Sequence, residues 1–181
     1  MSADPREDPG VSEFWLAALV HQFAAAIEAL ERAIRACPEH VWDDASLPIA
    51  QRFWYLAYHT LFWLDYYMAP NERDFRPPAP YTMGEMDPAG AYPDVVYTSQ
   101  QLLGYLDHGR RRCAARLGPL TETEAAQPCG FERRDMSVLE LFLYNMRHVQ
   151  HHAAQLNLIL RQRNAPVPGW VGQGRLSGGG A

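Results

Sequence analysis

Residues 137–163 are Ser-Val-Leu-Glu-Leu-Phe-Leu-Tyr-Asn-Met-Arg-His-Val-Gln-His-His-Ala-Ala-Gln-Leu-Asn-Leu-Ile-Leu-Arg-Gln-Arg, and this stretch decides the fold. It begins with a capping box, in which Ser137 caps a helix and Glu140 reaches back to it. One stripe at helical spacing then carries polar side chains where a core-facing stripe is normally apolar. Its members are Leu141, Asn145, His148, His152, Gln155 and Ile159. Polar groups on a buried stripe cost free energy unless something satisfies them, and a metal ion on the two histidines would do so.

Three further segments have helical character. Apolar stripes and stop signals at proline or glycine predict helices over 12–37, 46–69 and 98–117. The second of these is expected to begin at the cap Ser46, with Pro48 in its first turn. It is apolar or aromatic nearly all round, so either it is central or a loop or second subunit covers its outer face.

Four long amphipathic helices predict an all-α fold, a four-helix bundle over about 12–163 within one domain that spans 1–181. Residues 70–97 are rich in proline, glycine, aspartate and tyrosine and have no periodicity. Their aromatic residues argue against disorder, so we expect a long ordered loop between helices two and three that packs across the bundle as a lid. We expect 1–10 to be a loose leader and 164–181 a flexible or surface-draped tail.

The composition narrows the class of function. A net charge of −5 gives no electrostatic signature for nucleic-acid binding. The chain has no lysine, which excludes Schiff-base chemistry and a Walker-type phosphate loop. The three cysteines are far apart and form no C-x-x-C, which indicates reduced thiols in a cytoplasmic protein. No run of 18 apolar residues exists, so no membrane-spanning segment is expected. The expected partner is a small-molecule substrate.

Some conspicuous side chains receive structural interpretations. His21 lies beside the apolar stripe of the first helix and is expected at the surface. Cys113 falls on the inner stripe of the third helix and is expected to pack as a small core residue. A basic run in that same helix is interpreted as a solvated face. It comprises Arg110, Arg111, Arg112 and Arg116.

The histidines carry the functional prediction. His148 and His152 are one helical turn apart and can point at one ion. A third ligand is wanted, and among the other helices only His59 falls on an inner stripe. From the expected helix starts, His59 and His148 both lie about 16–18 Å along their helices, near mid-height. Three imidazoles leave a position open for water or substrate, and they suit Zn, Ni, Fe or Cu better than Mg or Ca.

Other polar residues receive provisional roles. Asn145 and Gln155 would orient the imidazoles or a bound water, unless they are ordinary polar packing at the helix seam. Tyr144 and Asp65 are possible proton-transfer groups, and Asp65 could equally be a surface charge. His151 either flanks the site or faces a partner. No catalytic residue is assigned.

The pentamer His148-x-x-x-His152 is not a zincin motif, because Val149 stands where those enzymes have glutamate. Together with Gln155 and the segment Tyr-Leu-Ala-Tyr-His-Thr-Leu-Phe-Trp-Leu around His59, it resembles the DinB-like superfamily over most of 12–163. That resemblance implies a four-helix bundle of unusual handedness, a divalent metal on these three histidines, and frequent homodimers. Ala154 replaces the glycine common before the family's final glutamine. Some relatives are thiol-dependent transferases or isomerases, and many have no assigned reaction.

Three functions remain open from the sequence. The first is a divalent-metal-dependent enzyme, a thiol-dependent transferase or isomerase or a hydrolase, in which Arg52 or Arg147 could hold a substrate carboxylate. The second is a non-catalytic dimeric bundle with a structural ion, in which the aromatic second helix forms the dimer interface. The third is a metal-free bundle whose histidines sense pH.

Overall fold

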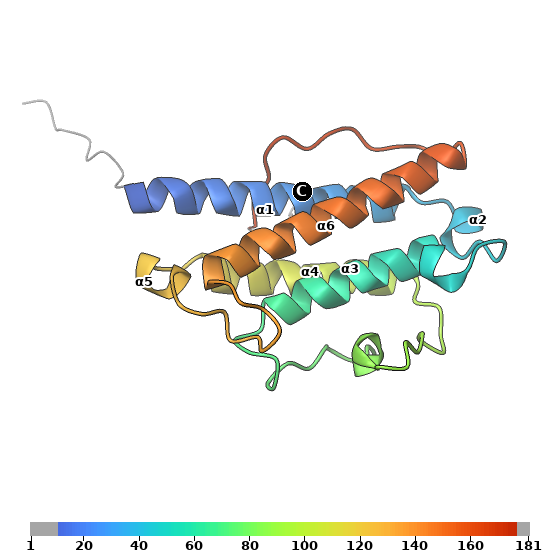
Figure 1. Ribbon diagram of the computed structural model, residues 1–181. Coiled ribbons are helices and arrows are strands. Elements are labelled where there is room, and N and C mark those ends of the chain that lie inside the picture. Colours follow the sequence, from blue (N-terminus) through green and yellow to red (C-terminus); the bar gives the residue numbers. More distant parts are fainter. Residues whose placement is uncertain (1–10, 177–181) are drawn as a thin grey trace, which may run out of the picture.

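The computed structural model describes residues 11–176, in which all regular secondary structure apart from one isolated β-bridge is helical (Figure 1). The all-α prediction is therefore confirmed. The four long helices are α1 (Val11–Ala36), α3 (Phe53–Tyr67), α4 (Ser99–Leu117) and α6 (Val138–Gln162). The short ones are α2 (Glu39–Trp42), α5 (Glu122–Ala125) and the 3-10 helices η1 (Ile49–Gln51) and η2 (Met83–Met86).

Each long helix packs against two others. Helix α6 contacts α1 and α3, and α4 contacts the same two helices from the opposite side (Figure 1). The core that they enclose contains large apolar side chains from every one of them, removed from water almost completely. Examples are Phe23, Leu30, Leu61, Phe62, Leu106 and Phe142.

Helix α1 contains a stretch that was tested as a membrane span. Its Glu13–Ala36 stretch is long and apolar enough to cross a membrane by length and composition alone. Core helices of soluble proteins and signal sequences pass the same test, so the finding is weak evidence for a membrane span. The inner face of α1 packs on α4 and α6.

The predicted capping boxes form. Ser137 accepts from the Glu140 backbone N–H at the start of α6, and the Glu140 carboxylate accepts from the Ser137 backbone N–H in return. Thr98 and Gln101 do the same at the start of α4. Both pairs satisfy backbone donors that the first helical turn leaves free. Local sequence therefore fixes where these two helices begin.

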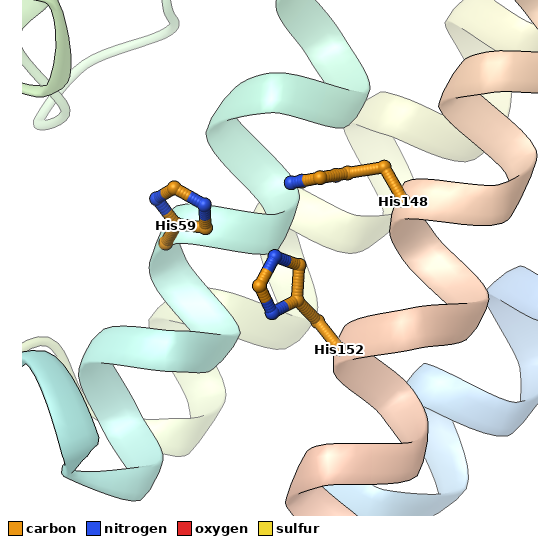
Figure 2. A group of neighbouring side chains, drawn as sticks. All are labelled: His59, His148 and His152. Carbon is orange, nitrogen blue, oxygen red and sulfur yellow. The ribbon is translucent and has the colours of Figure 1, made fainter.

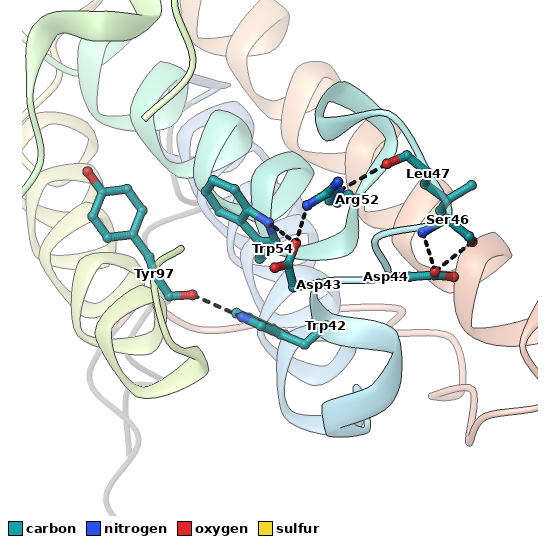
Figure 3. A network of polar contacts seen from close by, with 8 residues as sticks. All are labelled: Trp42, Asp43, Asp44, Ser46, Leu47, Arg52, Trp54 and Tyr97. Carbon is teal, nitrogen blue, oxygen red and sulfur yellow. Dashed lines mark hydrogen bonds and ion pairs between the residues drawn. The ribbon is translucent and has the colours of Figure 1, made fainter. Parts of the chain in front are cut away.

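The predicted start of the second helix was wrong. Ser46 caps no helix, because its backbone N–H and its hydroxyl both donate to Asp44 Oδ1, at 2.9 and 2.6 Å. Helix α3 begins at Phe53 and has Arg52 as its N-cap. The Arg52 guanidinium donates to Asp43 Oδ1 (2.9 Å) and to the Leu47 carbonyl (3.0 Å), which holds the preceding segment in a turn (Figure 3).

Residues 70–97 cover the outer face of α3. Phe75, Tyr81 and Tyr97 are buried there against the aromatic rings of α3. The Tyr81 hydroxyl donates to the Gln101 carbonyl at 2.7 Å, and the Trp42 indole donates to the Tyr97 carbonyl at 2.9 Å (Figure 3). We expected either a loop or a second subunit over the outer face of this aromatic helix, and the structure shows the loop there.

The C-terminal segment, residues 164–176, lies over α1. The Gly174 backbone N–H donates to the His21 carbonyl at 3.1 Å, and Leu176 is buried. A Cβ at Gly174 would lie 2.6 Å from backbone atoms of Ala24 and Ala25, so only glycine permits this approach. Up to Leu176 the tail is thus surface-draped, and His21 is half-buried beneath it. The expected leader, 1–10, and residues 177–181 lie outside the described residues.

The arginine run of α4 is not uniformly solvated. Arg111 is exposed, as predicted, but Arg110 is largely buried and forms an ion pair with Glu31 of α1. Arg112 reaches Asp65 of α3, so two of these arginines join α4 to its neighbours. Cys113 is fully buried, in agreement with a core role.

Candidate metal centre

Three histidines from two neighbouring helices converge on one point. His59 comes from α3, and His148 and His152 lie one turn apart on α6 (Figure 2). Each ring offers a nitrogen, and these atoms lie within 4.8 Å of one another. The ring centroids of His59 are 5.4 Å from those of His148 and 4.9 Å from those of His152. This is the grouping that the helical spacing predicted.

The predicted mid-height positions of His59 and His148 hold, but the predicted 16–18 Å does not hold for His59, which lies about 9 Å along α3 because that helix begins at Phe53. His59 is near the middle of the 15-residue α3, and His148 is near the middle of the 25-residue α6. Helices that pack side by side over their central turns bring such positions together. What matters is the distance from the helix centre, which a shifted N-terminus changes little.

The protonation state of two of these rings suits metal binding. Burial, helped by the neighbouring histidines, lowers the pKa of His148 to about 3. Burial and the proximity of His59 lower the pKa of His152 to about 4. Both rings are therefore neutral near pH 7 and each keeps a lone pair for a ligand bond. The buried Nδ1 of His148 has no hydrogen-bond partner among residues 11–176.

Two acceptors orient the other rings. Glu85 Oε2 lies 2.7 Å from His59 Nδ1, and Gln155 Oε1 lies 2.6 Å from His152 Nδ1. Carboxylate and amide oxygens accept hydrogen bonds, so Nδ1 carries the proton in both contacts. In the neutral form of either ring, the lone pair is then on Nε2. Fixing the tautomer in this way is how acceptors behind histidine ligands act in metal sites.

The family comparison covers the whole of this site. The model of the DinB superfamily matches residues 16–156, which include His59, His148, His152 and Gln155. The chain belongs to the DinB superfamily. Neither the curated proteins nor the solved structures contain a match to it.

Glu85 is the site residue that sequence reasoning missed in this DinB superfamily chain. It lies on η2 within the aperiodic segment 70–97, and its side chain is only 3% exposed. Burial raises the pKa of the nearby Tyr55, and the negative charge of Glu85 raises it further. No spacing rule connects a loop carboxylate to a histidine on the preceding helix. The only local signal is Thr82, which accepts from the Gly84 N–H and starts η2.

Asn145 has a different position from the one expected of an orienting residue. It is fully buried, and its Nδ2 donates to the Leu64 carbonyl at 3.0 Å, which ties α6 to α3. Of the two roles predicted for Asn145, this contact agrees with polar packing between helices and not with the orientation of an imidazole. Gln155, in contrast, makes the contact with His152 that an orienting role requires.

The two proposed proton-transfer groups have other partners. Tyr144 Oη accepts from Arg134 at 3.0 Å. Asp65 is not a surface charge, because it is fully buried between α3 and α4. It accepts from the Tyr105 hydroxyl at 3.2 Å and lies 3.3 Å from His108 Nε2 and 3.2 Å from Arg112 Nε. That cluster is separate from the three histidines.

The two candidate arginines differ in position. Arg52 is committed to the turn before α3 through Asp43. Arg147 is exposed and, with His148, His151 and Trp170, lines a cavity of about 530 Å³ between α1, α6 and the C-terminal segment. Of the two, Arg147 is therefore the one beside a predicted metal ligand. His151 is exposed at the same cavity and flanks the histidine group.

Proposed function

We propose that this DinB superfamily member is a four-helix-bundle metalloenzyme that binds one divalent transition-metal ion through His59, His148 and His152. The observation that carries the proposal is the convergence of three imidazole nitrogens within 4.8 Å on two packed helices. Three neutral nitrogen ligands suit Zn, Ni or Fe. A small-molecule substrate is proposed because the chain carries a net charge of −5, which disfavours nucleic acid.

The residues present fit such an ion. Two of the rings are held neutral by burial, and the third is oriented by a buried carboxylate. A divalent ion on three imidazoles keeps a position for water, a thiol or a substrate oxygen and acts there as a Lewis acid. Reactions consistent with this are a thiol-dependent transfer or isomerisation, or a hydrolysis.

The chain's own residues would prepare the site. Glu85 holds the proton on His59 Nδ1, and Gln155 holds the proton on His152 Nδ1. Trp63 and Tyr55 lie beside His59, with ring centroids 6.2 Å from its imidazole in both cases. These half-buried rings cover part of one side of His59.

Metal analysis of purified variants tests the ligand set. We expect about one ion per chain in the natural protein and in His151→Ala, the exposed neighbour outside the group. We expect loss of stoichiometric metal in His59→Ala, His148→Ala and His152→Ala. If His59→Ala and His148→Ala both keep stoichiometric metal, the three-histidine site is wrong.

A second measurement separates a catalytic ion from a structural one. The metal-loaded protein is assayed with small electrophiles and low-molecular-weight thiols, and circular dichroism is recorded before and after chelation. We expect turnover that chelation abolishes while the helical signal remains. Unfolding on chelation, together with an ion that shows no open coordination position, would support the structural role instead.

We also propose a homodimer. Helix α3 is covered by residues 70–97, so the supporting surface lies elsewhere, between the N-terminal halves of α1 and α6. Phe14 is 71% exposed and Leu143 is 39% exposed, and both line an apolar cavity of about 390 Å³. Exposed apolar clusters mark interaction surfaces. Sedimentation should give a dimer that Phe14→Glu converts to a monomer, and an unchanged sedimentation coefficient would contradict this surface.

A further inference from the structure

A second cavity lies away from the histidine group, between α1, α4 and the C-terminal segment. Its volume is about 730 Å³, within the range of pockets that hold small molecules. Four arginines and two glutamates supply the charges of its lining. They are Arg32, Arg35, Arg110 and Arg175, with Glu28 and Glu31.

The cavity has an excess of positive charge in an acidic protein. Glu28 pairs with Arg32, but the single charge of Glu31 is shared by Arg35 and Arg110. Arg175 forms no ion pair with any residue in 11–176. The arginines thus outnumber the carboxylates, although the whole chain has a net charge of −5. Such a concave cationic surface raises the local concentration of anions.

Arg110 has spare hydrogen-bonding capacity in this cavity. Its side chain is only 13% exposed, and its Nε is buried without a hydrogen-bond partner in the described chain. A buried donor without a partner is costly, so a group that accepts from it would be stabilised there. Guanidinium groups bind phosphate and carboxylate oxygens through paired N–H donors.

The C-terminal segment forms one wall of the cavity and is held on α1 by specific contacts. Gly174 sits directly on the backbone of α1 and donates to the His21 carbonyl at 3.1 Å. Gln173 contacts His21 Nδ1 at 2.8 Å, and the buried Leu176 anchors the far side. The exposed Arg175 is therefore held between two fixed points, next to the charges of α1 and α4.

We propose that this cavity binds a small organic polyanion, with Arg110 and Arg175 contributing donors from opposite parts of the chain. Phosphate esters and polycarboxylates share the required chemistry, which is two or more negative charges on clustered oxygens. The site is distinct from the histidine group, and its existence does not depend on the proposed metal chemistry.

Calorimetric titration of chelator-treated protein tests the proposal. The probes are pyrophosphate, adenosine monophosphate and citrate, each measured at constant ionic strength against sodium chloride. We expect saturable one-to-one binding of at least one probe, and the preferred probe separates phosphate from carboxylate ligands. Arg175→Gln breaks no ion pair within 11–176 and should weaken binding about tenfold, the effect of one charge-assisted hydrogen bond.

Two further variants sharpen the test. Glu31→Gln releases Arg35 and Arg110 from their shared carboxylate, so it should tighten binding of the same probe. Arg111→Gln removes an equal charge from an exposed neighbour in α4 and should leave binding unchanged. Absence of saturable binding overturns the proposal, as does an equal loss in Arg111→Gln and Arg175→Gln. Loss of binding in His148→Ala would place the anion at the histidine group instead.

Discussion

Glu85→Gln gives the sharpest test of the proposed metal centre. The Glu85 side chain is 3% exposed and its Oε2 lies 2.7 Å from His59 Nδ1. A charge-assisted hydrogen bond of this kind contributes about 1.5–3 kcal/mol. Mutating an acceptor behind a histidine ligand weakens metal binding about 10- to 100-fold, or about 1.4–2.7 kcal/mol, and Glu85→Gln keeps an acceptor oxygen but removes its negative charge. The two estimates agree, so we expect a dissociation constant raised by one to two orders of magnitude.

Competition with a chromophoric chelator measures that constant directly. At a fixed excess of metal the same loss should lower the Tm of Glu85→Gln by about 3–10 °C relative to the natural protein. Glu72→Gln is the matched control, since Glu72 is a carboxylate of the same loop that accepts from Tyr66 on α3 at 3.0 Å. Unchanged affinity in Glu85→Gln, or an equal loss in Glu72→Gln, would refute the reasoning.

Three further predictions follow from the structure. In metal-free protein the pKa values of His148 and His152 are lowered to about 3 and about 4, so the unfolded chain takes up protons first. The free energy of unfolding, measured in urea, should therefore fall as the pH drops below about 6.5, by up to about 1.4 kcal/mol per unit for each ring; a flat profile between pH 7 and 5 would contradict this. Gly174→Ala should release the C-terminal segment and speed its proteolysis, while Gly172→Ala, which has open space around its Cβ position, should not. Asp65→Ala should lower the free energy of unfolding by about 3–5 kcal/mol because it leaves the Arg112 guanidinium and the His108 ring without the buried carboxylate that they face, and a loss below about 1 kcal/mol would count against that network.

Features set by local chemistry were predictable from the sequence. The Ser137 and Thr98 capping boxes involve residues three apart, and their hydrogen bonds form as the pattern requires. The pairing of His148 with His152 depends only on the helical repeat. Ser46 shows the limit of this reasoning, because Asp44 competes for the same serine at closer range. A capping residue is identified only when its rival partners are known.

Features set by tertiary packing were not predictable. Glu85 reaches His59 only because the segment 70–97 folds back across α3. Arg110 and Arg112 looked like part of a solvated face, yet packing of α4 between α1 and α3 turns them toward Glu31 and Asp65. In both cases the partner lies on another element, and no pattern within the arginine run or the loop encodes it.

The covering of α3 by residues 70–97 has a consequence for synthesis on the ribosome. Helix α6 begins about 70 residues after α3 ends, a delay of about 4–14 s at 5–20 residues per second. During that time the aromatic rings of α3 lack their α6 neighbour. The loop follows α3 immediately in the chain, so Phe75 and Tyr81 can shield one side of the helix first. We expect nascent chains that stop near residue 100 to be less prone to aggregation than chains that stop at 70.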